Sequence, residues 1–444
     1  MRESVSAVFT TSTQIYFIKR QNYLSVFPGY YATPGGKVDT TDSSTVLEHT
    51  FWPSHIKPQI LHALIREVKE ELNFDLLKAI KEGHVLAIND IGIAITPEFN
   101  PYRFKNYYFN IRLKSPIDFQ VDQNEVEFGE WQSADQLLER YHQGSVLAVP
   151  PAITLLKAYK RNPLHDSPID MTLPYDPETE VPMIESLCGV KQFLPLSHTF
   201  PPANRTNSFI IGDNDSFRYL IDPSPKDEKE LAKFIKSISQ VGFDRILITH
   251  HHPDHYEFVR EISRHFNAAI SMSQYTYQAI GEDFFNGFDI TFLKEGDVIT
   301  KSLGSDVIVF EVPGHDEGQL ALAPRSLNWF LVGDLIQTIG TVVIGGPEGD
   351  MSKYFHSLKK VIDLNPKNII PSHGIIVGGT NKLTETLNHR LEREKQIIAL
   401  LHDNKSEQEM LDIVYAGLKP ELLPYALKTI EAHLKKIRSD LNLG

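Results

Sequence analysis

Cysteine is almost absent from this chain, since Cys188 is the only one among its 444 residues. A single thiol excludes an intramolecular disulfide and any cysteine-rich zinc site, and it is typical of a reducing compartment. Long apolar runs are also missing, because nowhere do about 18 uncharged apolar residues follow one another, so no membrane span is expected. The N-terminal residues lack the apolar core and cleavage pattern of a signal peptide. We therefore expect a cytoplasmic protein without a membrane partner.

Positive charge is in deficit as well. Lysine and arginine number 44 against 57 aspartates and glutamates, which gives a formal net charge of −13 at pH 7. Such a surface does not attract nucleic acid as a whole, so a polyanionic substrate needs a local basic patch or a metal. The hydrophobic share of 41% and the charged share of 23% are ordinary for a globular protein. The length predicts two or three domains.

A dense histidine stretch, Thr249–Tyr256, reads T-H-H-H-P-D-H-Y. It follows the apolar run 245–249, which predicts a buried strand with the polar side chains on the loop after it. Imidazole and carboxylate are ligands that suit a borderline ion such as zinc. His250 and His252 can converge on one ion, while Asp254 and His255 face a second. The alternative interpretation is a solvated loop that binds no metal.

Three further potential ligands each follow an apolar run: His315, Asp334 and His373. A single polar residue after a strand is usually only a surface group. The recurrence of four such strand ends between His250 and His373 favours a shared site.

With the H-x-H-x-D-H motif at 250–255, these residues resemble the metallo-β-lactamase fold in its dinuclear hydrolase branch, which includes lactamase-beta-2-like and glyoxalase-II-like proteins. The resemblance implies an αββα sandwich over residues 183–383 that holds two Zn²⁺ ions. The implied ligands are His250, His252 and His315 for one zinc, Asp254, His255 and His373 for the other, and Asp334 between them. Asp254 is also counted as catalytic, His251 as a bystander, and Asp222 as a residue that orients a ligand. Bound zinc lowers the pKa of water from about 15.7 toward 7, which suits ester, thioester or phosphodiester hydrolysis.

The N-terminal third contains a predicted amphipathic helix, Gln59–Asn73. On a different face from its apolar stripe, Glu67, Glu70 and Glu71 stand at i, i+3 and i+4, where like charges repel. A hard cation such as Mg²⁺ or Mn²⁺ relieves that repulsion. A solvated acidic helix face is the alternative.

This segment resembles the Nudix hydrolases. The resemblance rests on Gly36 and on the run 66–72, R-E-V-K-E-E-L. An insertion separates the two parts, and Asn73 replaces the closing glycine of the motif. The inserted box is similar to the coenzyme-A-hydrolysing type, although Ser25 stands where an arginine is expected. The resemblance implies an α/β/α sandwich over residues 1–160. It also implies that Glu67, Glu70 and Glu71 bind Mg²⁺ and act as catalytic residues in pyrophosphate hydrolysis of a nucleoside-diphosphate-linked substrate.

The remaining segments complete the predicted α/β and α+β multidomain protein. Residues 161–182 are rich in proline and read as a linker or draped strap. Residues 384–444 predict three helices, which resemble the winged-helix appendage of lactamase-beta-2-like proteins, some of them single-stranded RNA endonucleases. A helical cap is favoured over RNA binding, because one basic helix is weak evidence.

Two functions therefore stay open. The first is a small-molecule hydrolase acting on an acyl-thioester or a nucleoside-diphosphate derivative. The alternative is an endoribonuclease in which the Nudix-like domain only binds nucleotides or serves as a scaffold. RNA is a possible but not favoured partner, and the sequence does not predict the oligomeric state.

Overall fold

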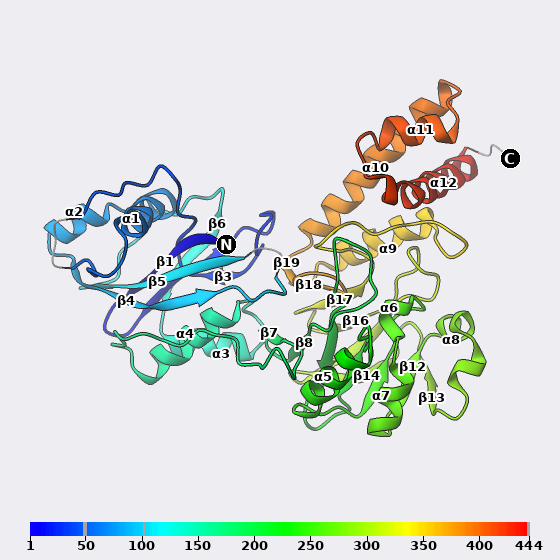
Figure 1. The fold of residues 1–444 in the computed structure, drawn as a ribbon, viewed down its shortest axis with the longest axis horizontal. Helices are drawn as coiled ribbons and strands as arrows, with labels where there is room; N and C mark the ends of the chain where they lie inside the picture. The colour runs from blue at the N-terminus through cyan, green and yellow to red at the C-terminus, as the bar shows by residue number, and fades with distance from the viewer. Residues whose placement is uncertain (48–50, 101–102, 442–444) are drawn as a thin grey trace. The chain divides into compact units, whose positions relative to one another are not determined.

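The computed structural model describes residues 1–47, 51–100 and 103–441. The chain forms two compact units (Figure 1): Met1–Pro174 with Glu185–Cys188, and Tyr175–Ile184 with Gly189–Gly444. Strand β7 (Met183–Leu187) lies where the chain passes between them. Within the described residues, no helix is both long and apolar enough to cross a membrane.

The first unit is built on one mixed sheet with the strand order β3-β2-β1-β5-β4, and β6 also pairs with β2. Its strands are β1 (Arg2–Thr10), β2 (Ile15–Arg20), β3 (Tyr31–Ala32), β4 (Val85–Ile95), β5 (Phe104–Leu113) and β6 (Val126–Gln132). Strand β1 is parallel to β5 and antiparallel to β2.

Helices cover both faces of this sheet (Figure 1). They are α1 (Pro58–Leu72), α2 (Leu76–Lys81), α3 (Ala134–His142) and α4 (Pro150–Arg161). Because side chains alternate along a strand, Ala7 and Phe9 of β1 join the core beneath α1, while Val8 joins the core beneath α3 and α4. The result is a three-layer α/β/α arrangement.

The proline-rich segment 161–182, predicted as a linker or draped strap, packs against the first unit over its first part. Ile169 donates its N–H to the Ile91 carbonyl at 2.8 Å, and Met171 is buried in the core of the first unit. The compact first unit accordingly extends to Pro174, beyond the expected boundary at residue 160.

The second unit contains two sheets. In the first, the strands run in the order β13-β12-β11-β10-β9-β8, and in the second in the order β14-β15-β16-β17-β18-β19. The first sheet has β8 (Val190–Phe193), β9 (Ser208–Ile211), β10 (Tyr219–Ile221), β11 (Arg245–Leu247), β12 (Ala269–Met272) and β13 (Ile290–Phe292). The second has β14 (Val298–Ser302), β15 (Ser305–Glu311), β16 (Leu320–Pro324), β17 (Phe330–Gly333), β18 (Asn368–Pro371) and β19 (Val377–Gly378).

Helices flank the two sheets in the αββα manner. Their bounds are α5 (Glu228–Ser239), α6 (Pro253–Tyr256), α7 (Val259–Phe266), α8 (Gln274–Ile280), the 3₁₀ turn η1 (Glu282–Phe285) and α9 (Met351–Leu364). Phe234 of α5 and Ile262 of α7 pack on the first sheet, and Leu358 of α9 packs on the second. Asp227 and Asp350 cap α5 and α9, because each carboxylate accepts a backbone N–H of the first turn.

The C-terminal segment is helical: α10 (Asn381–His402), α11 (Glu407–Val414), the 3₁₀ turn η2 (Pro420–Leu422) and α12 (Leu423–Asp440). These helices share their own core, which includes Ile397, Leu411 and Ile430. The first residues of α10, Leu383 and Leu387, pack with α9 instead. From residue 381 to 441 the described chain has no strand, so the expected helices form without a wing.

Strand direction explains why distant residues meet. Strands β10 and β11 are parallel, and so are β17 and β18. Strand β15 has the same direction as β17, because both are antiparallel to β16. The carboxyl ends of these strands therefore come together, and a hydrogen bond from Leu320 N–H to the Thr249 carbonyl at 2.9 Å joins the two sheets there.

Candidate metal centre

The histidine stretch begins where β11 ends and turns into the one-turn helix α6. Asp254 and His255 therefore lie in a helix and not on the loop that the sequence predicted. Pro253 occupies the first helical position, where its missing N–H costs nothing. The turn directs His255 into the interior, where it is fully buried.

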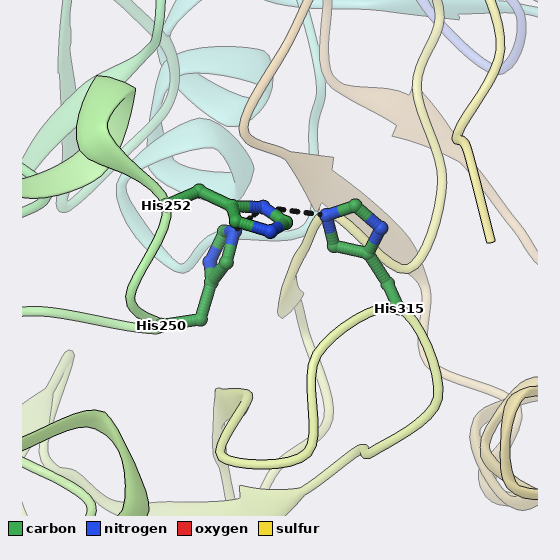
Figure 2. Close-up of side chains that lie close together, drawn as sticks. All are labelled: His250, His252 and His315. Carbon is green, nitrogen blue, oxygen red and sulfur yellow. Dashed lines mark hydrogen bonds between the residues drawn. The ribbon is translucent and has the colours of Figure 1, made fainter. Parts of the chain in front are cut away.

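Three imidazole nitrogens converge first (Figure 2). The Nδ1 atom of His252 lies 3.1 Å from Nε2 of His250 and 3.0 Å from Nε2 of His315. Burial lowers the pKa of His250 well below its usual value, and burial together with the neighbouring His315 lowers the pKa of His252 to about 3. The rings of His250 and His252 are therefore neutral at pH 7, which is the form that binds a metal.

A second donor set lies beside the first. The Nε2 atom of His373 is 3.5 Å from an Asp254 oxygen and 3.4 Å from Asp334 Oδ1, and His255 Nε2 is 3.8 and 3.7 Å from the same two atoms. Burial lowers the pKa of His255, but Asp254, Asp222 and Asp334 outweigh burial and raise the pKa to about 10. This set favours a positive charge at its middle.

Asp334 stands between the two sets. Its Oδ1 faces His255 and His373, while its Oδ2 lies 3.6 Å from His315 Nε2. The structure thus brings together all seven residues that the sequence singled out in this unit, and we call them the metal centre. They are His250, His252, Asp254, His255, His315, Asp334 and His373.

In three of these histidines, a carboxylate or a backbone carbonyl holds the ring nitrogen that points away from the centre. His255 Nδ1 lies 2.9 Å from Asp222 Oδ2, His315 Nδ1 lies 2.8 Å from the Val343 carbonyl, and His373 Nδ1 lies 3.0 Å from the Arg205 carbonyl. An Nδ1–H that donates to oxygen leaves the Nε2 lone pair free for a metal. Asp222 also accepts the N–H and the hydroxyl of Thr249, each at 2.7 Å, which fixes the start of the histidine stretch.

The donor atoms fit a pair of cations. Nε2 of His255, Nε2 of His373 and Oδ1 of Asp334 are buried and have no hydrogen-bond partner. A buried polar atom without a partner costs on the order of 1–3 kcal/mol, so three in one place are explained best by ions that they bind. Imidazole with carboxylate is the donor chemistry of zinc.

Sequence reasoning missed some supporting residues. His251 was expected to be a bystander, but its Nδ1 forms a close ion pair with Asp316, which is fully buried. Thr206 donates its hydroxyl to Asp254 at 3.2 Å. Asp316 could have been found, because it directly follows the strand-end ligand His315, whereas Thr206 follows no polar motif.

In the first unit, Arg66 pairs with two of the three predicted glutamates. Its guanidinium donates to Glu67 at 2.8 Å, to Glu70 at 3.0 Å and to Asp42 at 2.9 Å. The three predicted glutamates are absent from the groups of potential ligand atoms that lie within 4.8 Å of one another among the described residues. The expected repulsion between Glu67 and Glu70 is therefore relieved by this arginine, and metal binding by Glu67, Glu70 and Glu71 stays a prediction.

Glu71 is turned inward, which disagrees with the alternative of a solvated acidic helix face. It is 4% exposed and accepts the N–H of Gly35 at 2.7 Å. Burial raises the pKa of Glu71 to about 8, and burial also raises the pKa of Glu67. A Cβ at Gly36 would come within 2.3–2.5 Å of the Glu67 carboxylate, so this glycine leaves room for it. Glu125, which the sequence did not single out, adds its charge to both glutamates.

Known proteins resemble the second unit. The model of the Metallo-beta-lactamase superfamily matches residues 201–373. A Beta-lactamase-like protein 2 homolog of Drosophila melanogaster is 27% identical over 248 residues, which cover 53% of this chain and 82% of that protein. A hydroxyacylglutathione hydrolase of Bdellovibrio bacteriovorus is 28% identical over 36% of this chain and 60% of its own. The chain therefore contains a metallo-β-lactamase-fold hydrolase domain.

Solved structures agree on the fold of that domain. A β-lactamase domain protein from Burkholderia ambifaria superposes with a TM-score of 0.50 and 19% identity, over 58% of this chain and 87% of its own.

A NUDIX hydrolase from Alicyclobacillus acidocaldarius resembles 37% of this chain and 92% of its own, with 20% identity and a TM-score of 0.31. The Nudix interpretation of the first unit stays a prediction.

Proposed function

We propose that the second unit hydrolyses acyl esters, with thioesters as the preferred class, and that it uses two zinc ions held by the metal centre. The observation that carries this proposal is the meeting of two donor sets at Asp334, with buried donor atoms that have no other partner. Zinc ions held by these residues would supply a water of lowered pKa and a Lewis acid for the substrate carbonyl. Hydrolysis then needs no nucleophilic side chain.

The chain's own residues prepare this chemistry. Asp222, the Val343 carbonyl and the Arg205 carbonyl fix the tautomer and direction of three ligand rings before any ion arrives. Such fixed donors do not have to reorganise during the reaction, and this is how an enzyme stabilises a developing charge.

The charge around the centre supports an acyl substrate over RNA. Glu348 lies 3.8 Å from His252 Nε2 and adds negative charge at the first donor set. On α12, Lys436 is paired with Glu394 at 2.8 Å, and Arg438 lies 3.8 Å from Glu407. RNA binding relies on lysines and arginines that neutralise phosphates, and these two already have acidic partners.

A metal analysis joined to a substrate panel tests the proposal. The purified full chain is expected to hold two equivalents of zinc and to release thiol from acyl-thioesters, while short RNA stays intact. His252→Ala should stop thiol release, and His265→Ala, which changes an exposed histidine of α7, should not. A protein that takes up no transition metal, or that cuts RNA but no ester, contradicts the proposal.

We propose a second activity for the first unit: Mg²⁺-dependent or Mn²⁺-dependent hydrolysis of a nucleoside-diphosphate linkage, with coenzyme A-like compounds as candidate substrates. The supporting observation is the packing of the Gly35–Gly36 turn on α1. There Glu71 is buried against the Gly35 N–H, and burial raises the pKa of Glu71 and of Glu67. A hard cation suits carboxylates in such a place.

This second proposal has its own test. With Mg²⁺ present, ADP-ribose and coenzyme A are expected to be cleaved by the full chain and not by Glu71→Gln. Glu98→Gln, an exposed glutamate of the same unit, serves as the control. Binding of these compounds without cleavage supports a nucleotide-binding module instead.

A further inference from the structure

The C-terminal helix α10 reaches the metal centre through one buried arginine. Arg390 is 5% exposed, and its guanidinium donates to the Val342 carbonyl at 2.5 Å and to the Thr341 hydroxyl at 3.4 Å. Among the described residues, no carboxylate oxygen lies within 4.0 Å of its nitrogens. Burying a charged guanidinium is costly unless its donors are satisfied. Here a loop carbonyl and a hydroxyl accept from it, so Arg390 fixes the position of this loop.

The loop that Arg390 holds is the one that orients a metal ligand. The Val343 carbonyl, one residue beyond the carbonyl that Arg390 binds, accepts the Nδ1–H of His315 at 2.8 Å. That bond sets the direction of the His315 ring and leaves its Nε2 facing His252 (Figure 2). A shift of the 341–343 loop therefore moves the third ligand of the first donor set.

A second contact runs from the same arginine toward Asp334. The positive charge of Arg390 also acts on the hydroxyl of Tyr354, whose pKa burial raises to about 12, and that hydroxyl donates to the Leu335 carbonyl at 2.8 Å. Leu335 directly follows Asp334, the residue between the two donor sets. The Tyr354 backbone also packs tightly on Gly314, where a Cβ would approach it within 2.3 Å, so α9 supports the residue before His315 as well.

We propose that Arg390 is a positioning residue of the metal centre: it couples the C-terminal helices to His315 through the 341–343 loop and to Asp334 through Tyr354. The inference rests on the proposed metal centre. It adds that the C-terminal helices α10–α12 help to set the metal affinity of that centre. Partners outside the ligand shell typically change metal affinity by about 10–100-fold.

The test measures metal affinity in the full chain by competition with a chelator after loading with Co²⁺, whose absorption bands report the coordination of each ion. Arg390→Met keeps the side-chain length but removes all donors, and we expect at least one ion to bind about 10–100-fold more weakly. Arg390→Lys, which keeps one donor group, should recover part of that loss. Altered cobalt bands in Arg390→Met, at full occupancy, are expected from a displaced His315.

Arg393→Met is the matched control, because Arg393 lies one turn further along α10 and donates to the Val414 carbonyl of α11 instead. This variant loosens the appendage without touching the 341–343 loop, so its metal affinity and cobalt bands should match the wild type. Equal weakening in Arg393→Met, or wild-type affinity in Arg390→Met, overturns the proposal.

Further measurements distinguish a folding defect from a failed inference, and a failed inference from a failed metal centre. If Arg390→Met does not fold, Arg390→Lys and the isosteric Tyr354→Phe decide, since both should weaken metal binding several-fold, and wild-type affinity in both overturns the inference. If the wild type itself takes up no transition metal, the proposed metal centre fails and the inference fails with it. Two ions in the wild type and an unchanged Arg390→Met remove the inference alone.

Discussion

In the second unit, buried donor atoms of the metal centre face one another without a partner, whereas the glutamates of α1 in the first unit already share an arginine. His255, His373 and Asp334 each keep a buried atom unbonded. Glu67 and Glu70 both accept from Arg66. The first arrangement could accept cations without losing a partner, whereas the second must exchange a partner or a proton before it binds one.

The support around the two clusters differs in the same way. Three ligand histidines of the metal centre are each fixed through Nδ1 by an oxygen of the surrounding chain. Glu70 has a side chain that is 59% exposed, and it pairs with Arg66 at 3.0 Å at the surface. Rigid, pre-oriented ligands favour tight binding, because little entropy is lost when the ion arrives. We therefore expect tight zinc binding in the second unit and weak, exchangeable Mg²⁺ binding in the first.

The largest expected effect comes from Asp334, the residue between the donor sets. Asp334→Asn removes the charge that faces both, and we expect thioester hydrolysis to fall by about 10³-fold or more, because metal-assisted catalysis supplies several kcal/mol. Initial rates of thiol release measure this. Asp306→Asn, at an exposed ion pair with Arg325, should keep full activity. A full-rate Asp334→Asn enzyme would remove the proposed role of the metal centre.

Asp222 tests the support around the ligands. Asp222→Asn keeps the shape but weakens the bond to His255 Nδ1, so zinc affinity should fall by about 10–100-fold. Retention of zinc against a graded chelator measures this. Asp213→Asn is the control, because that carboxylate caps the turn at Leu303 and Gly304 in the same unit. Unchanged retention in Asp222→Asn contradicts a pre-oriented site.

Much of the metal centre could be predicted from the sequence, because strand ends are local features. His315, Asp334 and His373 each follow a short apolar run, and parallel strands carry such ends to one edge of a sheet. The supporting contacts could not be predicted in this way. Arg390 lies on a helix among other charged residues, and only the tertiary structure shows that it points into the protein.

The α1 glutamates illustrate the opposite outcome. The helix itself was predicted within one residue at each end, from the spacing of its apolar side chains. The surroundings of its charges depend on loops that carry no periodic signal, such as the turn at Gly35 and the residues around Asp42. The spacing of the glutamates does not show that Glu71 is buried, nor that the Gly35 N–H is its partner.

The stability of the first unit should depend on pH through Glu71. The pKa of Glu71 is about 8 in the folded state against a usual value of 4.5. Between those values the folded state binds more protons than the unfolded state, so stability should fall as the pH rises through this window, by on the order of 3 kcal/mol. Hydrogen exchange of the α1 amides, followed from pH 5 to 8 without Mg²⁺, measures the change.

Glu71→Gln serves as the comparison for that measurement. Glutamine does not ionise, so this variant should lose the pH dependence and protect α1 better than the wild type at pH 8. Mg²⁺ should restore protection at pH 8 in the wild type only, since the ion stabilises the carboxylate. The same pH profile in both proteins would assign the effect to another group.

The smallest expected effect tests whether Arg66 stands in for a cation. Arg66→Gln leaves Asp42, Glu67 and Glu70 without their shared donor. Because Asp42 is 8% exposed, the loss should destabilise the first unit by about 1–2 kcal/mol. Mg²⁺ should recover that loss and bind several-fold more tightly than to the wild type, since it no longer competes with a guanidinium. Arg103→Gln, at a partly exposed pair with Glu98, is the control and should change neither stability nor Mg²⁺ affinity. If Mg²⁺ instead binds more weakly to Arg66→Gln, the arginine organises the carboxylates and does not stand in for the ion.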